Sequence, residues 1–342
     1  MTTRRLKRMA YAFVLCASVS AGSAVVGVAT AAEEIKLSFA YYASETSWPG
    51  PVITQWAARI GEETGGQVVV DVFPGGTLLD RNGMFDGVET GAADIGMSII
   101  KDPGRFPMQY GFGLPLGVAN AEVGSKMIFD LVKEFDPDEL KGFKVLAVFS
   151  SGPGYLQTRK KITSLEDIKG QEIRGTGGGV AVLKKLGANP VGMSIRGVAQ
   201  ALQTGVINGY MTSLTVIKDF KLAEQVGHVT QYPFNVVTFA VVMNRGKWES
   251  LPANVQAAVD RISREISIYG GSIYDKHEVE AVEWAKAEHG VQIHELDADE
   301  AARWNEAVAP LIGEWIDAQT ARGLPAQEFL NRLKELQTEL KN

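Results

Sequence analysis

One short segment of the sequence combines residue types that suit the binding of an anion. Arg174 stands at the end of a predicted strand over residues 171–174, and Gly175-Thr176-Gly177-Gly178-Gly179 then leads into a predicted helix over residues 180–186. Glycines let backbone N–H groups approach an anion closely, and the first turn of a helix has N–H donors without intrahelical partners. The guanidinium of Arg174 would add a planar pair of donors that matches a carboxylate. The spacing alone is equally compatible with a structural ion pair of Arg174 and a simple glycine turn.

The sequence contains no pattern that indicates catalysis or a bound metal. Its four histidines, all in the last third of the chain, form neither an HxxxH nor an HExxH spacing, and Cys16 is the only cysteine. The GxSxG elbow and the GxxxxGK[ST] loop are both absent, and Val180 stands where a GxGxxG motif needs its last glycine. We therefore expect no catalytic residue, no metal and no cofactor.

Length and composition indicate a packed α/β protein of about two domains. The chain has 342 residues, of which 45% are hydrophobic and 22% charged, values that are ordinary for globular proteins. The formal net charge of −6 argues against nucleic acid as a partner, because binding a phosphate backbone requires a basic surface.

The first 32 residues are typical of a secretory signal peptide. Four basic residues lie within residues 1–8, an apolar stretch follows over residues 9–32, and Ala29-Thr30-Ala31 provides small residues for cleavage. The alternative is an uncleaved anchor helix, since the apolar stretch is long enough to span a bilayer. Cleavage removes four of the 34 basic residues and none of the 40 acidic ones, so the net charge becomes −10. The sequence thus predicts an acidic protein exported to the periplasm.

The remaining chain alternates predicted strands with predicted helices, which favours α/β architecture. A loop at residues 150–154 separates two units, and the most apolar predicted strand, residues 236–243, is expected to cross back to the first unit. The last third is helical in pattern, with residues 250–289 periodic except at Gly270-Gly271. In the first unit, strands are predicted at residues 35–42, 67–73, 93–100 and 144–149, and helices at 49–64 and 84–90; in the second unit, further strands are predicted at 190–193 and 206–211, and later helices from 297 to about 322 and at 328–340.

Several short motifs in register give the chain a family resemblance. The run Leu165–Arg174 (LEDIKGQEIR) resembles the pattern D-[LM]-K-G-x-K-[IL]-R, and the segments Gly91–Gly96, Leu186–Pro190, Ala201–Gly209 and Val242–Asn244 match as well. Residues 34 to about 320 are thereby similar to the extracytoplasmic solute receptors of TRAP transporters, the DctP-type substrate-binding proteins.

This resemblance implies a fold, a partner and a ligand anchor. The fold would be periplasmic-binding-protein-like (type II), with two α/β lobes joined by crossing strands and a long helix that spans both. The lobes would comprise residues 33–150 plus about 237–276, and 151–236 plus about 277–325, followed by a C-terminal helix at 326–342. Arg174 would form the salt bridge to the ligand's carboxylate, assisted by a basic residue for which Lys160 aligns best. The partner would be the membrane permease of the transporter.

Departures from the family pattern bear on the ligand. Positions that hold polar or aromatic ligand contacts in some members are here Ile99, Ile195 and Met211, so the ligand is expected to have an apolar body. Trp48 and Tyr41, with Tyr42, Phe149 and Tyr155, are candidates for aromatic walls, although an ordinary place in the core is the alternative for each. The complete set of candidate ligand-binding residues is Arg174, Lys160, Thr212, Met211, Ile195, Ile99, Trp48, Tyr41, Tyr155, Gly175, Thr176 and Arg196.

The favoured ligand is therefore an aromatic or aliphatic monocarboxylate. A small dicarboxylate is the alternative, since Arg196, Lys160 and Thr212 are available for a second acid group. A sensor subunit and an enzyme on the same fold are the other classes of function to be considered.

Overall fold

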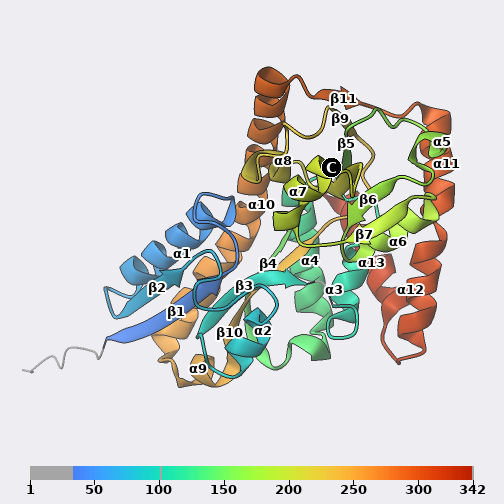
Figure 1. Cartoon of the computed structure of the whole chain (residues 1–342). Coiled ribbons are helices and arrows are strands. Elements are labelled where there is room, and N and C mark those ends of the chain that lie inside the picture. Colours follow the sequence, from blue (N-terminus) through green and yellow to red (C-terminus); the bar gives the residue numbers. More distant parts are fainter. Residues whose placement is uncertain (1–33, 101, 341–342) are drawn as a thin grey trace, which may run out of the picture. The chain divides into compact units, whose positions relative to one another are not determined.

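Two β-sheets organise the described chain, which covers residues 34–100 and 102–340 of the computed structural model (Figure 1). The described residues belong to one compact unit that begins at Glu34, and the predicted signal peptide lies outside them. The first sheet has the strand order β2-β1-β3-β10-β4 and the second the order β11-β9-β5-β8-β6-β7. The strands of the first sheet are β1 (Ile35–Tyr41), β2 (Val68–Phe73), β3 (Ile95–Ile100), β4 (Phe143–Ser150) and β10 (Thr238–Asn244); those of the second are β5 (Tyr155–Thr158), β6 (Glu172–Gly175), β7 (Asn189–Gly192), β8 (Gly209–Thr212), β9 (His228–Thr230) and β11 (Gln292–His294).

The chain passes between the two sheets along paired segments. It leaves the first sheet after β4 and returns to it through β10, which lies antiparallel between β3 and β4. The crossing of residues 236–243 is thus confirmed. The two connecting segments are hydrogen-bonded to each other: the Ser151 amide donates to the Val237 carbonyl at 2.8 Å, and the Gly154 amide donates to the Asn235 carbonyl at 2.6 Å. This pairing fixes where the two sheets join.

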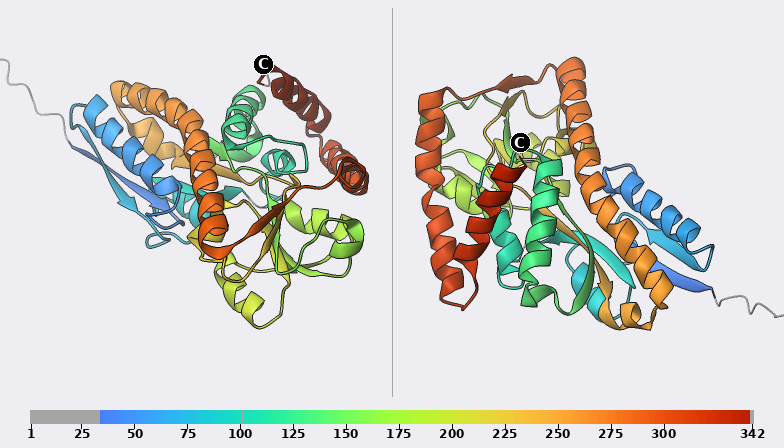
Figure 2. Two further views of the ribbon diagram at one scale, coloured as in Figure 1. Left: turned by 90° about the horizontal axis from the view of Figure 1, so that it is seen from above. Right: turned by 180° about the vertical axis from the view of Figure 1, so that it is seen from behind.

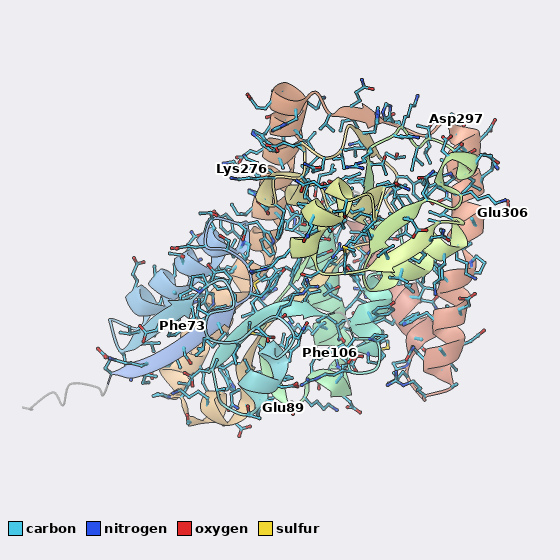
Figure 3. The ribbon with its side chains drawn as sticks, in the orientation of Figure 1. Phe73, Glu89, Phe106, Lys276, Asp297 and Glu306 are labelled. Carbon is cyan, nitrogen blue, oxygen red and sulfur yellow. The ribbon has the colours of Figure 1, made fainter. Side chains whose placement is uncertain are left out.

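Helices cover both faces of the first sheet. On one face, α1 and the long helix α10 enclose an apolar core with β1, β3, β4 and β10. On the other face, α2, α3 and α4 bury aromatic residues, among them Phe106, whose ring lies 5.0 Å from that of Phe85 (Figure 3). The C-terminal helix α13 lies beside α4 (Figure 2). These helices are α1 (Pro49–Glu63), α2 (Met84–Glu89), α3 (Pro107–Phe112), α4 (Ala121–Phe135), the 3₁₀ turn η1 (Asp138–Leu140), α9 (Arg245–Ser250), α10 (Ala253–His289) and α13 (Ala326–Glu339).

The second sheet is likewise packed on both faces. Helices α6 and α11 cover the face that contains Leu156, Ile173 and Met211, and helices α7 and α8 with the last part of α10 cover the face that contains Tyr210 and Val229. The helices of this part are α5 (Leu165–Ile168), α6 (Gly178–Lys185), the 3₁₀ turn η2 (Ile195–Gly197), α7 (Val198–Gln203), α8 (Thr215–Asp219), α11 (Ala298–Val308) and α12 (Pro310–Thr320).

One helix prediction needs correction, and helices α3, α4, α8 and α9 were not predicted. The single helix expected after Asp297 is divided into α11 and α12, because Pro310 begins a new helix after Ala309 and cannot donate to the preceding turn. Helix α4 was not predicted from the sequence. Gly124 and Ser125 interrupt its apolar stripe, although both residues are buried and a Cβ at Gly124 would lie 2.7 Å from the Ser150 side chain.

Helix α10 spans the two sheets without a break. Its first part contributes Val255, Val259 and Ile262 to the core of the first sheet, and its last part contributes Ala281 and Ala285 to the core of the second. Its 37 residues correspond to a length of about 55 Å, and Figure 2 shows its whole course. The described residues contain no helix that is both long and apolar enough to span a membrane.

The glycine pair within α10 allows close packing and does not interrupt the helix. A Cβ at Gly270 would lie 2.2 Å from the Phe149 ring, and a Cβ at Gly271 would lie 2.7 Å from the carbonyl oxygen of Ala121 and from the Cα of Glu122. Because the obstruction at Gly271 is backbone, a side chain there cannot be accommodated by a rotamer change. The two glycines thus bring α10 against β4 and α4.

We predict that Gly271→Ala lowers the free energy of unfolding by about 1–3 kcal/mol, because the added methyl group forces α10 away from α4. The matched control is Gly313→Ala in α12, where a Cβ would meet nothing within 4 Å, and this variant should gain about 0.5–1 kcal/mol. Chemical denaturation of both variants is the measurement. A Gly271→Ala protein as stable as the wild type would show that the close contact is not required.

Candidate ligand-binding site

Arg174 carries a buried positive charge without a carboxylate partner. It is the third residue of β6, its exposed fraction is 3%, and its Nε donates to the backbone carbonyl of Met193 at 3.1 Å. Burial, and to a smaller extent the neighbouring Arg81, lower the pKa of the guanidinium to about 10, and Tyr210 opposes this shift. Within residues 34–100 and 102–340, Arg174 has no ion pair. A structural ion pair, the alternative left open by the sequence, is therefore not found in the part of the chain described.

The strand register places polar side chains beside Arg174. Arg174 pairs with Tyr210 in β8, and Tyr210 pairs with Gln157 in β5, so all three side chains lie on one face of the sheet. Gln157 donates through Nε2 to the Thr212 carbonyl at 2.9 Å, while its Oε1 and the Tyr210 hydroxyl are buried without a hydrogen-bond partner among the described residues. Burial raises the pKa of Tyr210 well above its ordinary value, and Arg174 opposes this shift.

Further predicted residues lie on the same face, nearer the strand ends. Arg174, Tyr210 and Gln157 form a row across the strands, the Arg174 row. Tyr155 pairs with Thr212, and each lies two residues along its strand from a member of this row. Burial raises the pKa of Tyr155 to about 12, with smaller contributions from Glu278 and Asp275. Ile195 lies in η2, two residues after the carbonyl that binds Arg174. Arg174, Tyr155, Thr212 and Ile195 thus lie together at the C-terminal ends of β6 and β8. Open α/β sheets bind ligands at the carboxyl ends of their strands.

The glycine segment after Arg174 approaches other parts of the chain closely. Gly177 precedes α6 with φ +57° and ψ −136°, a conformation that only glycine adopts readily. A Cβ at Gly178 would lie 3.3 Å from the carbonyl oxygen of Gly113, and a Cβ at Gly179 would lie 2.6 Å from Cε of Met211. Met211 therefore packs under this segment, on the opposite face of the sheet from Tyr210. Gly175 is buried and Thr176 is half-buried at the start of the same segment.

The strand register places Lys160 away from Arg174, and Arg196 is exposed. Lys160 is exposed and follows Thr158, which pairs with Gly209 at the first residue of β8. It therefore lies toward the end of the strands opposite to Tyr155 and Thr212. Arg196 is exposed in η2. The motif alignment could not show at which end of the strands Lys160 lies, because that depends on the direction of β5 in the sheet.

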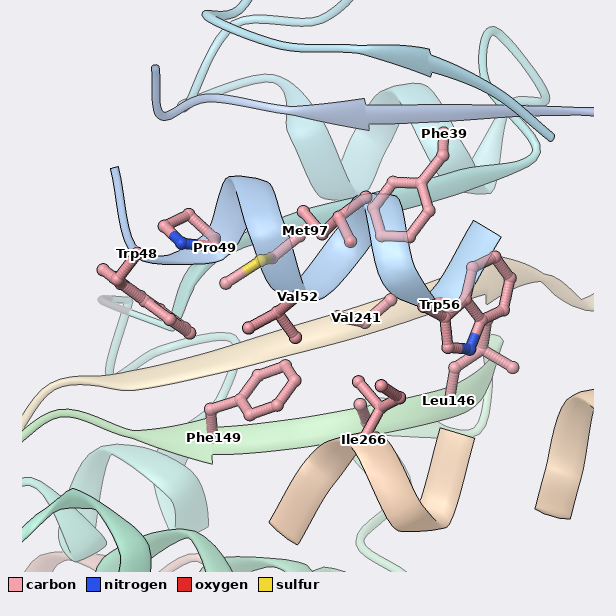
Figure 4. A pocket seen from close by; sticks show the side chains of 12 residues that line it. Phe39, Trp48, Pro49, Val52, Trp56, Met97, Leu146, Phe149, Val241 and Ile266 are labelled. Atoms are coloured by element: carbon pink, nitrogen blue, oxygen red, sulfur yellow. The ribbon is translucent and has the colours of Figure 1, made fainter. Parts of the chain in front are cut away.

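Trp48, Tyr41 and Ile99 lie at the first sheet, away from the Arg174 row. Trp48 is 6% exposed and packs edge-on against Phe149, Phe239 and Tyr274, with ring centroids 5.0–5.8 Å apart. Tyr41 belongs to the same core, and Ile99 packs against it from β3. An apolar pocket between α1, the sheet and α10 (Figure 4) contains no residue of the second sheet; it is lined by Phe39, Trp48, Pro49, Val52, Ile53, Trp56, Met97, Leu146, Ala147, Phe149, Val241 and Ile266. The positions of Trp48, Tyr41 and Ile99 in and against this core favour a packing role for them.

Arg81 is a basic residue near Arg174 that the sequence analysis missed. It lies between β2 and α2, and its guanidinium carbon is 5.6 Å from the centre of the Tyr42 ring. Burial raises the pKa of Tyr42 to about 12, Arg81 lowers it, and Asp219 of α8 raises it. Arg81 could have been recognised as a candidate from its position in a loop after a predicted strand, because ligand contacts commonly occur there in α/β sheets. The described residues contain no cluster of three or more side chains that could hold a metal ion.

Comparison with known proteins identifies the family. The family model of the bacterial extracellular solute-binding proteins, family 7 (DctP), matches residues 39–318. The chain belongs to this family. It is 26% identical over 320 residues to the C4-dicarboxylate-binding periplasmic protein DctP of Rhodobacter capsulatus, an alignment that covers 89% of this chain and 94% of the relative.

Solved structures agree with this assignment. A TRAP periplasmic solute-binding protein from Desulfovibrio salexigens is 32% identical with a TM-score of 0.83, covering 90% of this chain and 96% of that chain. A marine metagenome TRAP solute-binding protein specific for aromatic acid ligands is 30% identical with a TM-score of 0.83, covering 90% and 99%. The family resemblance and the fold class inferred from the sequence are thus confirmed, and the chain is a solute receptor of the TRAP type and not an enzyme.

In this receptor, Glu278 is a buried carboxyl group where the chain crosses between the sheets. A Cβ at Gly152 would lie 2.7 Å from its Oε2, which has no hydrogen-bond partner among the described residues. Burial, and to a smaller extent Asp275, raise the pKa of Glu278 to about 8, and a hydrogen bond from the Leu214 backbone opposes the shift. Glu278 in turn raises the pKa of Tyr155 and of Tyr274. The neutral acid is therefore the form that the folded protein favours.

We predict that Glu278→Gln is more stable than the wild type at pH 8 and equally stable at pH 4.5. The folded pKa is raised above the unfolded one, so Glu278 destabilises the wild type increasingly between these pH values. At pH 8 the variant should melt about 3–6 °C higher, and melting curves across the range are the measurement. Glu280→Gln, an exposed neighbour on α10, is the control. A constant difference between Glu278→Gln and wild type would contradict the prediction.

Proposed function

We propose that this receptor captures a small organic acid through Arg174 and delivers it to the membrane permease of a TRAP transporter. The observation that carries the proposal is the buried, unpaired guanidinium of Arg174. A charge removed from water is unfavourable unless an opposite charge and hydrogen bonds compensate it. A carboxylate would supply both, with two parallel hydrogen bonds to the guanidinium.

The surroundings of Arg174 favour an aromatic or aliphatic monocarboxylate. Ile195 offers apolar surface near the strand ends on the face of Arg174, while Tyr155, Thr212 and the backbone of Gly175 and Thr176 offer a few polar contacts. Lys160 and Arg196, which the sequence offered for a second acid group, are exposed. The related marine metagenome protein is specific for aromatic acid ligands, which supports the same class.

A small dicarboxylate is the second candidate. The Rhodobacter capsulatus relative is a C4-dicarboxylate-binding protein at 26% identity. A second acid group would require a cation in the part of the site that faces away from Arg174. A role as the ligand-sensing subunit of a membrane receptor would use the same site.

Capture would involve closure of two lobes around the ligand. The proposed lobes are residues 33–150 with about 237–276 and residues 151–236 with about 277–325, followed by a proposed C-terminal helix at 326–342, of which the described part contains α13 (Ala326–Glu339). The paired segments at Ser151–Gly154 and Asn235–Val237 would act as the hinge. A ligand that contacts both lobes stabilises the closed state.

We predict that Arg174→Gln abolishes the binding of benzoate and phenylacetate, with a loss of at least about 100-fold in affinity, because the carboxylate loses its charged partner. Arg174→Lys should lose most of the affinity as well, since an ammonium cannot form the planar pair of hydrogen bonds. Isothermal titration calorimetry of both variants is the measurement.

Arg159→Gln is the matched control, because Arg159 is an exposed basic residue of the same sheet edge as Lys160. Its affinity should stay within about twofold of the wild type, as expected for a surface charge. The unliganded Arg174 variants should melt close to the wild type. An unliganded protein that collapses would instead show that Arg174 is structural.

Export to the periplasm completes the proposal. Residues 1–32 have the pattern of a signal peptide. We predict that protein recovered from the periplasm of an expressing Gram-negative host begins at Ala32 or Glu33, as read by N-terminal sequencing. A chain that keeps its first residues and stays in the membrane fraction would support the anchor alternative.

A further inference from the structure

We propose that Arg81 is a second anchor for the ligand's acid group, so that one carboxylate is held between Arg81 and Arg174. This inference rests on the proposed function. It adds to the ligand site a residue of the loop between β2 and α2, which belongs to the first sheet. It also specifies the ligand as an acid whose single carboxylate meets both guanidiniums. The remaining part of the ligand would then lie against apolar surface.

Arg81 is half-buried and has unused hydrogen-bonding capacity at a buried atom. Its Nε is buried and has no hydrogen-bond partner among the described residues, and no ion pair to its side chain occurs there. The ring of Tyr42 covers one side of the guanidinium at 5.6 Å. The Tyr42 ring stabilises a cation weakly but cannot accept the hydrogen bonds that the N–H groups offer.

Arg81 lies close enough to Arg174 to lower the pKa of the Arg174 guanidinium. The charged or polar groups that influence Arg174 are Arg81 and Tyr210, and no carboxylate is among them. Asp219, which acts on Tyr42, is itself paired with His277 at 2.7 Å between Oδ1 and Nε2. Two like charges in partly buried positions repel each other. An anion placed between them removes this repulsion and accepts hydrogen bonds from both.

The loop that carries Arg81 is held in place by its own contacts. The Asp80 carboxylate accepts hydrogen bonds from the amides of Asn82 and Gly83 at 2.7 and 2.8 Å. The Ser98 hydroxyl of β3 donates to the carbonyl of Arg81 at 3.0 Å. The position of Arg81 therefore depends on the first sheet, whereas that of Arg174 depends on β6 of the second. A carboxylate bound to both residues would link the two sheets directly.

The experiment compares Arg81→Gln, Arg81→Lys and Arg174→Gln with the wild type by titration with benzoate, phenylacetate, hexanoate and succinate. We expect Arg81→Gln to weaken the binding of the monocarboxylates by at least about 30-fold, the loss typical of a buried charge partner. Arg81→Lys should lose about 10-fold, because it keeps the charge without the planar donors. It also provides the test if the glutamine variant does not fold.

Arg264→Gln is the matched control. Arg264 is exposed on α10, and its removal should change the affinities by less than about twofold. X-ray scattering with saturating benzoate adds a second measurement: the ligand should compact the wild type and the control, but not Arg81→Gln.

The outcomes separate this inference from the proposed function. If Arg174→Gln loses binding while both Arg81 variants keep the wild-type affinity for monocarboxylates, the inference is overturned and the proposed function stands. If the Arg81 variants lose affinity only for succinate, Arg81 binds a second acid group and the shared carboxylate is refuted. If the wild type binds none of the four acids, or Arg174→Gln binds them normally, the proposed function itself fails.

Discussion

The burial of a guanidinium without an acid partner is the constraint around which the second sheet is organised. The Nε of Arg174 donates to the Met193 carbonyl, its exposed fraction is 3%, and no carboxylate of the described residues forms an ion pair with it. A protein that used this residue only for stability would gain more from an apolar side chain of similar volume. Burying this charge costs free energy in the unliganded receptor. A bound solute would supply the acid partner that compensates this cost.

The architecture explains how such a site can form between two sheets. The chain crosses twice between them in segments that are hydrogen-bonded to each other, and α10 contributes to the cores of both. The close contacts of Gly270 and Gly271 hold α10 firmly on β4 and α4. The crossing segments lie in loops between β4 and β5 and before β10, and we propose that relative movement of the sheets occurs there. Glu278, buried beside Gly152, makes this region sensitive to protonation.

The sequence predicted the elements more accurately than the site. The ends of the predicted strands agree to within a few residues, because glycines and prolines interrupt short runs of β-branched residues at the boundaries. Strands β5, β9 and β11 were not predicted. Ser164 and Asp297 cap α5 and α11 through hydrogen bonds from the amides of Asp167 and Glu300. Arg174 was recognised from its motif, but Lys160 was placed with it by alignment although the strand direction separates them. Arg81 was missed because it belongs to no motif.

The sequence by itself determined the family, the alternation of strands and helices, and the one arginine that precedes a glycine turn, since all three depend on local residue patterns. Only the tertiary structure decided which side chains share the face of Arg174, that Trp48 and Tyr41 pack in the core of the first sheet, and that Arg81 lies close to Arg174. Those relations arise from strand register and from the packing of segments far apart in the chain, neither of which a local pattern contains.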